Sequence, residues 1–402
     1  MTGPPEPHAP AAPVSRTLWA KPRLRADEEA GRERKTSWLE LFYDLVFVVI
    51  VAALSHLLAT HPDRDGLASF VLLFLPACWL WIGGTFYTER FEVEDLSHRL
   101  FTFLQMFPVA AMAVFAHAGT GETSVPFALS YVAGRLLIIF LWFRAGLHDR
   151  RAKPVTNRFT AGFLLSVALF LASLWVAPPL RFALWLLALA IDFCTPLFTL
   201  RLQAKLPRYS TSRLPERFGL FVLIVLGENV VSVISGVAAH AHPGLRILAT
   251  GALGMLLAFG FWWIYFDLVH RRQPRPGLAP GLLRNYLHVP LIMAMTATAA
   301  ATLTILAAEA TAVPTGLRWL LAGSVAATLA CLALLHAVLR PGGAARVEAG
   351  LRRMLWAGVA GCVLLGAVGA GLTGLSLLAA LVTVQALLVL YAVLHWARGH
   401  LA

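Results

Sequence analysis

The chain consists of long apolar segments separated by short polar connections. A run of about 20 apolar residues is long enough to cross the hydrocarbon core of a bilayer as a helix, and the pattern predicts twelve such helices. The predicted spans are 38–59, 67–88, 100–118, 126–147, 159–177, 180–200, 216–239, 246–269, 286–307, 317–339, 354–371 and 374–396. The stretch "GLTGLSLL" separates the last two spans, and the alternative there is one long broken helix. The predicted fold is an all-α polytopic membrane protein.

Charged residues are scarce, which supports this fold class. Of the 402 residues, 58% are hydrophobic and only 13% are charged, and the mean hydropathy is +0.72. About a quarter of the residues in a soluble globular domain are charged. Most of the surface is therefore expected to face lipid, and the bilayer is the expected partner.

The positive charges lie almost entirely on one side of the predicted topology. With the N-terminus in the cytoplasm, 28 of the 33 lysines and arginines fall on the cytoplasmic side, 4 fall in the opposite loops, and Arg135 lies within a helix. Short cytoplasmic loops retain basic residues, so both termini are expected in the cytoplasm. The same distribution explains the net charge of +12 without a nucleic-acid partner.

The chain is expected to contain a tail and two related halves. Residues 1–36 are predicted to form a disordered cytoplasmic tail, followed by six-helix halves over 37–205 and 206–402. Three consecutive segments recur in order: "LELFYDLVFVVIVAALSH" matches "PERFGLFVLIVLGENVVS", "CWLWIGGTFYTER" matches "GFWWIYFDLVHRR", and "LFTFLQMFPVAAMA" matches "YLHVPLIMAMTATA". Six is an even number of helices, so the halves would share one orientation, as in parallel transporter repeats.

Two acids lie at the start of the first span. Glu40 and Asp44 are four residues apart and share one helix face, and Ser55 falls on the same face further along. We expect them at the mouth of a substrate or ion pathway. The alternative is structural, because acids are favourable at a helix N-terminus and could also pair with loop arginines.

A third acid lies deeper in the predicted membrane. Glu228 and the following Asn229 are candidate pathway residues. Glu228 is ~18 Å into its span at 1.5 Å per residue. A charge at the bilayer centre costs about 2.5–3.5 kcal/mol, so this carboxylate suits cation coordination or proton relay. The alternative is a neutral glutamate that forms a hydrogen bond between helices. If the halves pack face to face, Asp44 and Glu228 would be staggered along one pathway.

The remaining intramembrane candidates have both functional and structural interpretations. Arg135 and Asp192 either belong to the pathway or form a structural ion pair. Asp267 either belongs to the pathway or forms a salt bridge to Arg271 near the cytoplasmic surface. Four tryptophans at matching repeat positions are expected in an interfacial belt or in the lining of a cavity: Trp79, Trp81, Trp262 and Trp263.

No motif indicates a metal, a cofactor or soluble enzyme chemistry. The sequence has no H-E-x-x-H, G-x-S-x-G or P-loop motif. The four cysteines lie singly in apolar segments, without the spacing of a zinc site or a disulfide framework. We therefore expect no metal and no cofactor, and enzymatic activity is not the favoured interpretation.

Two motifs resemble a known family. "WLELFYDLVFVV", followed by "LSHLL", and "ERFGLFVLIVLGENV" resemble the bacterial low temperature requirement A (LtrA) family, and "FWWIYFD" is similar to it as well. The resemblance runs from about Arg34 to the C-terminus. It implies a multi-pass protein of the bacterial inner membrane, named for growth in the cold, and supplies no mechanism.

Three functions are consistent with these features. The favoured one is transport or conduction of a small solute or ion, with intramembrane carboxylates as coordinating or coupling groups. The second is a non-catalytic membrane protein that supports growth under cold or envelope stress. The third is a membrane-embedded enzyme that modifies lipids, which would require acids or histidines clustered near the cytoplasmic face.

Overall fold

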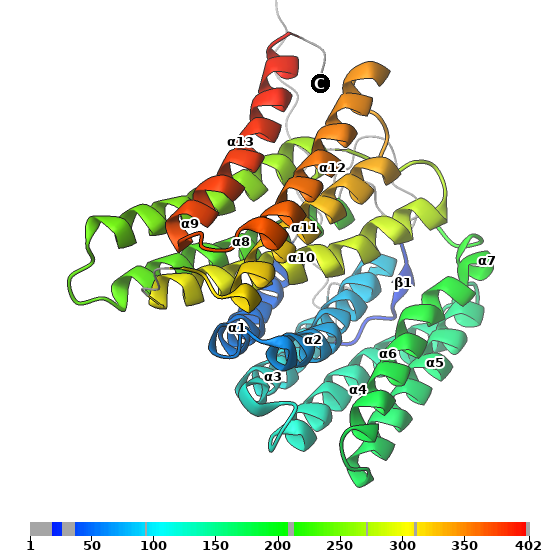
Figure 1. The fold of residues 1–402 in the computed structure, drawn as a ribbon. Coiled ribbons are helices and arrows are strands. Elements are labelled where there is room, and N and C mark those ends of the chain that lie inside the picture. Colours follow the sequence, from blue (N-terminus) through cyan, green and yellow to red (C-terminus); the bar gives the residue numbers. More distant parts are fainter. Residues whose placement is uncertain are drawn as a thin grey trace, which may run out of the picture.

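The protein is a bundle of long, largely apolar helices (Figure 1). The computed structural model describes residues 18–25, 37–92, 95–207, 213–270, 272–308 and 312–398. Within these ranges twelve helices have the length and composition of membrane spans, which confirms the predicted fold class. The last two spans are separate helices, joined through Gly371, whose positive φ of 85° suits glycine.

The first half contains six spanning helices and a short seventh helix. Their bounds are α1 (Trp38–Thr60), α2 (Arg64–Arg90), α3 (Leu96–Phe115), α4 (Ser124–His148), α5 (Lys153–Ala172), α6 (Leu180–Phe198) and α7 (Leu200–Gln203), with 3₁₀ turns η1 (Ala116–Ala118) and η2 (Ser173–Trp175). The predicted boundary at 205/206 lies between α7 and the next helix.

The second half contains the other six spans. Their bounds are α8 (Arg213–Ala238), α9 (Leu245–Tyr265), α10 (Leu278–Ala307), α11 (Thr315–Val338), α12 (Ala345–Val368) and α13 (Gly374–Ala397), and α9 continues into a π-helical turn, η3 (Phe266–His270). Helices α10 and α12 begin eight and nine residues before their predicted starts. Apolar runs mark only the lipid-facing part of a helix, whereas its backbone hydrogen bonds continue into the polar interface.

Helix neighbours follow the same order in both halves. In the first half α1 packs against α2 and α3, and α3, α4, α5 and α6 pack in sequence. In the second half α8 packs against α9 and α10, and α10 to α13 follow in the same way. The halves meet where α1 packs against α8 and α10. A duplication predicts this agreement, but the parallel repeat itself stays a prediction.

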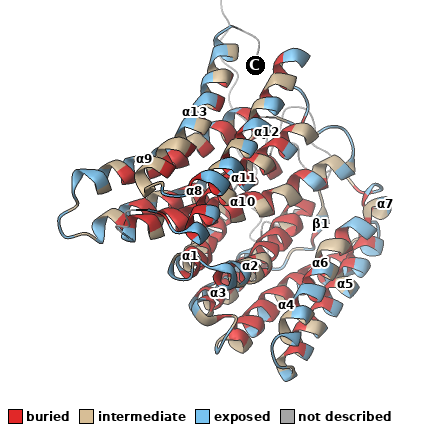
Figure 2. Cartoon of the chain, viewed as in Figure 1, coloured by how far each residue is buried: buried red, intermediate tan, exposed pale blue. Residues whose placement is uncertain are grey.

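One hydrophobic core runs through both halves. Figure 2 shows buried residues concentrated on the inward faces of α1, α2, α8, α10 and α11, with exposed residues on the outer helices. Large apolar side chains such as Phe107, Phe198 and Leu364 are exposed on the outside, as expected for surfaces in lipid. Polar side chains that lie between α1, α2 and α8 are therefore buried inside the bundle.

Most lysines and arginines lie at one end of the bundle, which we call the basic end. Helices α1, α3, α5, α8, α10 and α12 begin there, and the intervening spans end there. Helix α1 begins in a capping box, in which the Ser37 hydroxyl accepts from the Glu40 amide and the Glu40 carboxylate accepts from the Ser37 amide. Asp95 is the N-cap of α3. These caps place acids at the basic end.

A short N-terminal segment packs against the basic end. Strand β1 (Arg23–Leu24) pairs antiparallel with β2 (Phe91–Glu92), and the guanidinium of Arg144 lies 4.2 Å from the centre of the Trp19 ring. Disorder is predicted for residues 1–36. The stretch 18–25 is ordered by these contacts, and the rest of the predicted tail lies outside the described residues.

Candidate functional site

An ion pair inside the bundle joins the first helices of the two halves. Arg217 of α8 donates from Nη2 to Oδ1 of Asp44 in α1, with the two atoms 2.7 Å apart. The same oxygen accepts a 2.7 Å hydrogen bond from the indole Nε1 of Trp81. Asp44 and Arg217 are almost fully buried, so their charges compensate each other in a medium of low dielectric constant.

A second ion pair extends this contact toward the basic end. Glu40 accepts a hydrogen bond from Nη2 of Arg213, and its Oε1 lies 3.8 Å from Nη1 of Arg217. Nη1 of Arg217 also donates to the Thr88 hydroxyl at 2.9 Å. We call Glu40, Asp44, Trp81, Thr88, Arg213 and Arg217 the charge network. Its two acids and two arginines balance, which is how buried charges are tolerated in a membrane.

Aromatic rings pack around Trp81 and Arg217 of this network. Trp81 stacks on Phe221 with ring centres 4.3 Å apart and contacts Phe218 edge-to-face at 5.0 Å. The Arg217 guanidinium lies 5.8 Å from the centre of the Trp81 ring, within cation–π range. The indole thus packs on α8 and binds the acid of α1, which fixes the relative position of the two helices.

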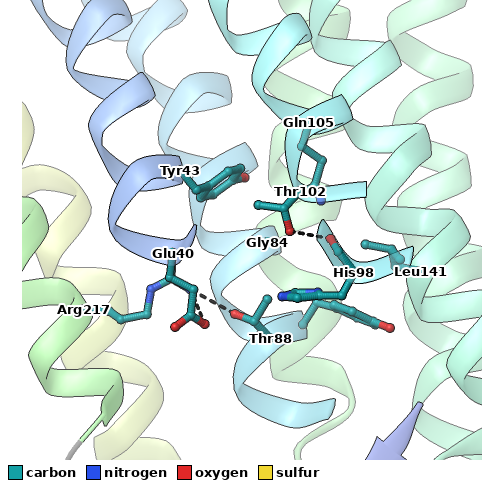
Figure 3. Close-up of a pocket in the computed structure, with 10 residues that line it drawn as sticks. Glu40, Tyr43, Gly84, Thr88, His98, Thr102, Gln105, Leu141 and Arg217 are labelled. Carbon is teal, nitrogen blue, oxygen red and sulfur yellow. Dashed lines mark hydrogen bonds and ion pairs between the residues drawn. The ribbon is translucent and has the colours of Figure 1, made fainter. Parts of the chain in front are cut away.

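A pocket lies beside the charge network, between α1, α2, α3 and α4 (Figure 3). The gaps between its atoms, together with adjoining open solvent, amount to about 330 Å³. Its lining consists of Glu40, Tyr43, Gly84, Tyr87, Thr88, His98, Thr102, Gln105, Leu141 and Arg217. We call it the basic-end pocket. It brings side chains of five helices, including α8, to one space at the end where the acids of α1 lie.

Two buried polar groups of this pocket have no hydrogen-bond partner. They are the Tyr43 hydroxyl and Oε1 of Gln105, whose Nε2 donates to the Phe101 carbonyl at 3.1 Å. Gly84 lies between them, since a Cβ there would be 2.7 Å from the hydroxyl and 3.3 Å from Oε1. An unpaired buried polar group costs about 1–3 kcal/mol, so water or a ligand with a donor and an acceptor would be stabilised here.

A separate ion pair lies near the middle of the first half. Nη2 of Arg135 donates to Oδ1 of Asp192 at 2.8 Å, and the Tyr131 hydroxyl donates to Oδ2 at 2.7 Å. The guanidinium also lies 4.2 Å from the centre of the Phe163 ring. A Cβ on Gly83 would be only 2.8 Å from Nη1 of Arg135, so the glycine makes room for the arginine. The structure thus contains an ion pair between Arg135 and Asp192, which was the structural interpretation of these two residues.

These residues do not form a metal site. Among the residues that the structure describes, no group of three histidine, cysteine or carboxylate side chains could hold a metal ion. The two polar clusters and the pocket instead offer hydrogen-bond donors and acceptors inside a mostly apolar bundle. Such an arrangement can bind a small polar group but presents no arranged nucleophile.

A comparison with models of protein families shows the family to which this chain belongs. A sequence model of the bacterial low temperature requirement A protein (LtrA) family matches residues 35–393, a range that includes every residue of the charge network and the pocket. The chain belongs to this family. It is also similar to an uncharacterized protein of Rhizobium meliloti (strain 1021), with 29% identity over 289 residues, which are 66% of this chain and 68% of the relative.

The deep acid of this LtrA protein does not join the charge network. Glu228 lies eleven residues beyond Arg217 along α8, or ~16 Å at 1.5 Å per residue. It accepts a 3.1 Å hydrogen bond from the Ser232 hydroxyl, and Asn229 donates to the Val225 carbonyl. No basic side chain among the described residues forms an ion pair or hydrogen bond with Glu228. A pathway through both Asp44 and Glu228 stays a prediction.

The other predicted residues divide between buried and outward positions. Ser55 is buried, and its hydroxyl has no hydrogen-bond partner. Asp267 is exposed on η3, and the predicted salt bridge to Arg271 lies outside the described residues. Trp79 is buried and stacks on Phe193 with ring centres 4.0 Å apart.

The four tryptophans differ between the halves. Trp79 and Trp81 are buried, whereas Trp262 and Trp263 are 44% and 41% exposed on the outer surface of α9. The outward position of the α9 pair agrees with the interfacial alternative, and a place in the lining of a cavity stays a prediction. Helix α9 presents a different face to its neighbours than α2 does, because α13 packs closely against α9.

Several residues of the site carry no clear signal in the sequence. Arg213, Arg217 and His98 look like ordinary polar residues near the start of a span, and Tyr43 and Gln105 look like ordinary side chains of largely apolar segments. The adjacent Gly83 and Gly84 in the middle of α2 are the one available signal. Glycine inside a helix often marks close approach of another group, and each of the two accommodates a different polar cluster.

Proposed function

We propose that this LtrA-family protein transports or conducts a small polar solute or ion, which enters at the basic end. The basic-end pocket carries the proposal, because the Tyr43 hydroxyl and Oε1 of Gln105 face one buried space without protein partners. A solute that supplies the missing donor and acceptor would gain affinity there. A purely structural bundle gains nothing from leaving two such groups unpaired.

The neighbouring charge network supplies a means of coupling. Arg217 contacts Glu40 and Asp44 of α1 and Thr88 of α2, and Glu40 and Arg217 also line the pocket. An ion or proton that changes the charge of either acid would weaken one of these contacts. The relative position of the two halves would then change, which is the kind of motion that transporters with two repeats use.

The orientation and location in the cell form part of this proposal. The basic end holds most of the lysines and arginines, so it is placed in the cytoplasm by the positive-inside rule. Both termini would then be cytoplasmic, and membership of a bacterial family supports the inner membrane. The pocket would accordingly open to the cytoplasm.

A non-catalytic role in the membrane is the second candidate. It is favoured by the pairing of Glu40, Asp44 and Asp192 with arginines, because paired acids can serve the architecture alone. The basic-end pocket, which such a role leaves unused, distinguishes the two candidates.

Flux through purified protein in proteoliposomes tests the proposal. Interior dyes would report entry of H⁺, Na⁺ and K⁺, and stopped-flow light scattering would report entry of glycerol, urea and glycine. We expect flux of at least one probe above that of protein-free liposomes. Flux no higher than in protein-free liposomes for every probe would favour the non-catalytic role.

Two variants connect the flux to the pocket. Tyr43→Phe removes a hydroxyl that has no partner in the protein, so it should leave the fold intact while reducing flux at least tenfold. Thr383→Val is the control, because this threonine is exposed on α13 and bonds only within its own helix. Equal flux in wild type and Tyr43→Phe would remove the pocket from the pathway.

A further inference from the structure

One buried arginine of the second half forms no side-chain hydrogen bond or ion pair with the described residues. Arg284 lies in the second turn of α10, near the basic end, and only 2% of it is exposed. Its Nε and Nη2 are enclosed and have no hydrogen-bond partner, and none of the ion pairs among the described residues includes it. Buried charges are normally paired, so this guanidinium requires an explanation.

Two other deeply buried arginines have acidic partners. Arg135 pairs with Asp192, and Arg217 pairs with Asp44. In the predicted repeat Asp44 corresponds to Leu220 of α8. The second half therefore has no acid at the position from which Asp44 of the first half pairs with Arg217.

The side chains around Arg284 do not compensate its charge either. His288, one turn further along α10, forms a 2.7 Å hydrogen bond from Nδ1 to the Arg284 carbonyl. Since the carbonyl can only accept, Nδ1 carries a proton, and Nε2 can accept from the Tyr265 hydroxyl 3.0 Å away. Tyr265 and His288 thus satisfy each other. Asp267, on the adjacent turn η3, is exposed and forms no ion pair with Arg284.

The unpaired nitrogens lie on one edge of the guanidinium. Nε and Nη2 point their hydrogens in the same direction, and this edge forms two parallel hydrogen bonds with a carboxylate or phosphate. The neighbouring turn η3 is π-helical, a local structure that is frequent at functional sites.

We propose that the Nε/Nη2 edge of Arg284 binds a phosphate or carboxylate group at the basic end of the bundle. The group belongs either to a small soluble anion or to the headgroup of an anionic lipid, which share this chemistry. Anionic lipids are enriched where basic loops meet the membrane. The site is separate from the basic-end pocket and does not depend on the transport proposal.

Thermal unfolding of the purified full-length protein tests the site. Tryptophan fluorescence would give Tm for delipidated protein in a neutral detergent, with inorganic phosphate replacing chloride at constant ionic strength. A second arm would compare nanodiscs of phosphatidylcholine with nanodiscs that also contain phosphatidylglycerol. We expect phosphate or phosphatidylglycerol to raise Tm of the wild type by several degrees, because a ligand that binds only the folded state stabilises it.

Arg284→Met provides the decisive variant, since it keeps an unbranched, flexible side chain and removes the guanidinium and its charge. The anion-dependent rise in Tm should disappear in Arg284→Met and persist in Arg352→Met, a control at an exposed position of α12 at the same end. Without anion, Arg284→Met should unfold at the same or a higher temperature than wild type, because it removes an uncompensated buried charge. This readout separates lost binding from misfolding.

Each outcome is assigned in advance. A response to phosphate in detergent identifies a soluble anion, and a response only to phosphatidylglycerol identifies a lipid headgroup. No response to either, or an equal response in Arg284→Met and wild type, overturns the proposal. A lower Tm of Arg284→Met without anion would also overturn it, because Arg284 would then have a partner within the protein.

Discussion

Arg217 of α8 donates a 2.7 Å hydrogen bond to Asp44 of α1 and so connects the two halves of the bundle through a buried charge pair. Oδ1 of Asp44 also accepts from Trp81, whereas Oδ2 has no hydrogen-bond partner. The pair is therefore balanced in charge but incomplete in hydrogen bonding. The charge balance makes the Asp44–Arg217 pair important for stability. Because Oδ2 of Asp44 has no partner, a change in the charge of Asp44 would alter the contact.

Replacing Arg217 by methionine should strongly destabilise the protein. The variant leaves Asp44 as a buried carboxylate without its compensating charge, which costs about 3–5 kcal/mol. The measurement is the change in unfolding free energy or in Tm in detergent, followed by tryptophan fluorescence. The double variant Asp44→Asn/Arg217→Met should recover much of the loss, because both charges are then absent. Strictly additive effects of the two substitutions would contradict this pairing.

Gly84 should be intolerant of alanine, whereas Gly227 should accept it. A Cβ at Gly84 would lie 2.7 Å from the Tyr43 hydroxyl, and such overpacking costs about 1–3 kcal/mol. A Cβ at Gly227 meets nothing within 4 Å, so Gly227→Ala should be neutral or stabilise α8 by about 0.5–1 kcal/mol. Thermal unfolding of the two variants in parallel gives the comparison. Equal effects would show that Gly84 is not closely packed.

The stability that the Asp95 carboxylate contributes should be lost at acidic pH. Partial burial raises the pKa of the Asp95 carboxyl. Hydrogen bonds from the Ser97 hydroxyl and the His98 amide, at 2.7 and 2.8 Å, outweigh that effect and lower the pKa. The Ala20 amide and the charge of Arg144 act in the same direction. The folded-state pKa therefore lies below the usual value of about 3.9.

The sign of the effect follows from this lowered pKa. A carboxyl with a depressed pKa contributes stability above its unfolded pKa, and the contribution is lost as the pH falls through the folded pKa. Asp95→Asn should therefore lower Tm at pH 7, and the gap from wild type should narrow below about pH 4. Measuring Tm of both proteins from pH 7 to pH 3 tests this. A gap that is independent of pH would mean that the charge of Asp95 does not contribute.

Glu228→Gln should abolish flux without unfolding the protein. Glutamine can still accept the hydrogen bond of the Ser232 hydroxyl, and no basic side chain of the described residues loses a partner. If Glu228 coordinates a cation or relays a proton, loss of its charge should reduce flux in proteoliposomes by at least tenfold. Thr383→Val, at an exposed position of α13, is again the control. Wild-type flux in Glu228→Gln would exclude Glu228 from the pathway.

The sequence anticipated most of the membrane architecture. Spans were predictable because lipid tolerates only long apolar helices with satisfied backbones, and the twelve observed helices follow the predicted ones except at their ends. The acids Glu40, Asp44 and Glu228 were identifiable because charge is expensive in such helices. Their partners were not, since an arginine at the start of α8 looks like any basic loop residue until α1 is placed beside it.

The sequence by itself determined the fold class, the number of spans, the basic end and the positions of the costly charges, because each depends on local hydropathy. Only the tertiary structure decided which of those charges are paired. It connected Asp44 to Arg217 and Arg135 to Asp192, and it left Arg284 without an acid. The physical reason is distance. Ion pairing and the formation of a pocket depend on which helix faces meet, and residues 173 positions apart in the chain, such as Asp44 and Arg217, meet only in the packed bundle.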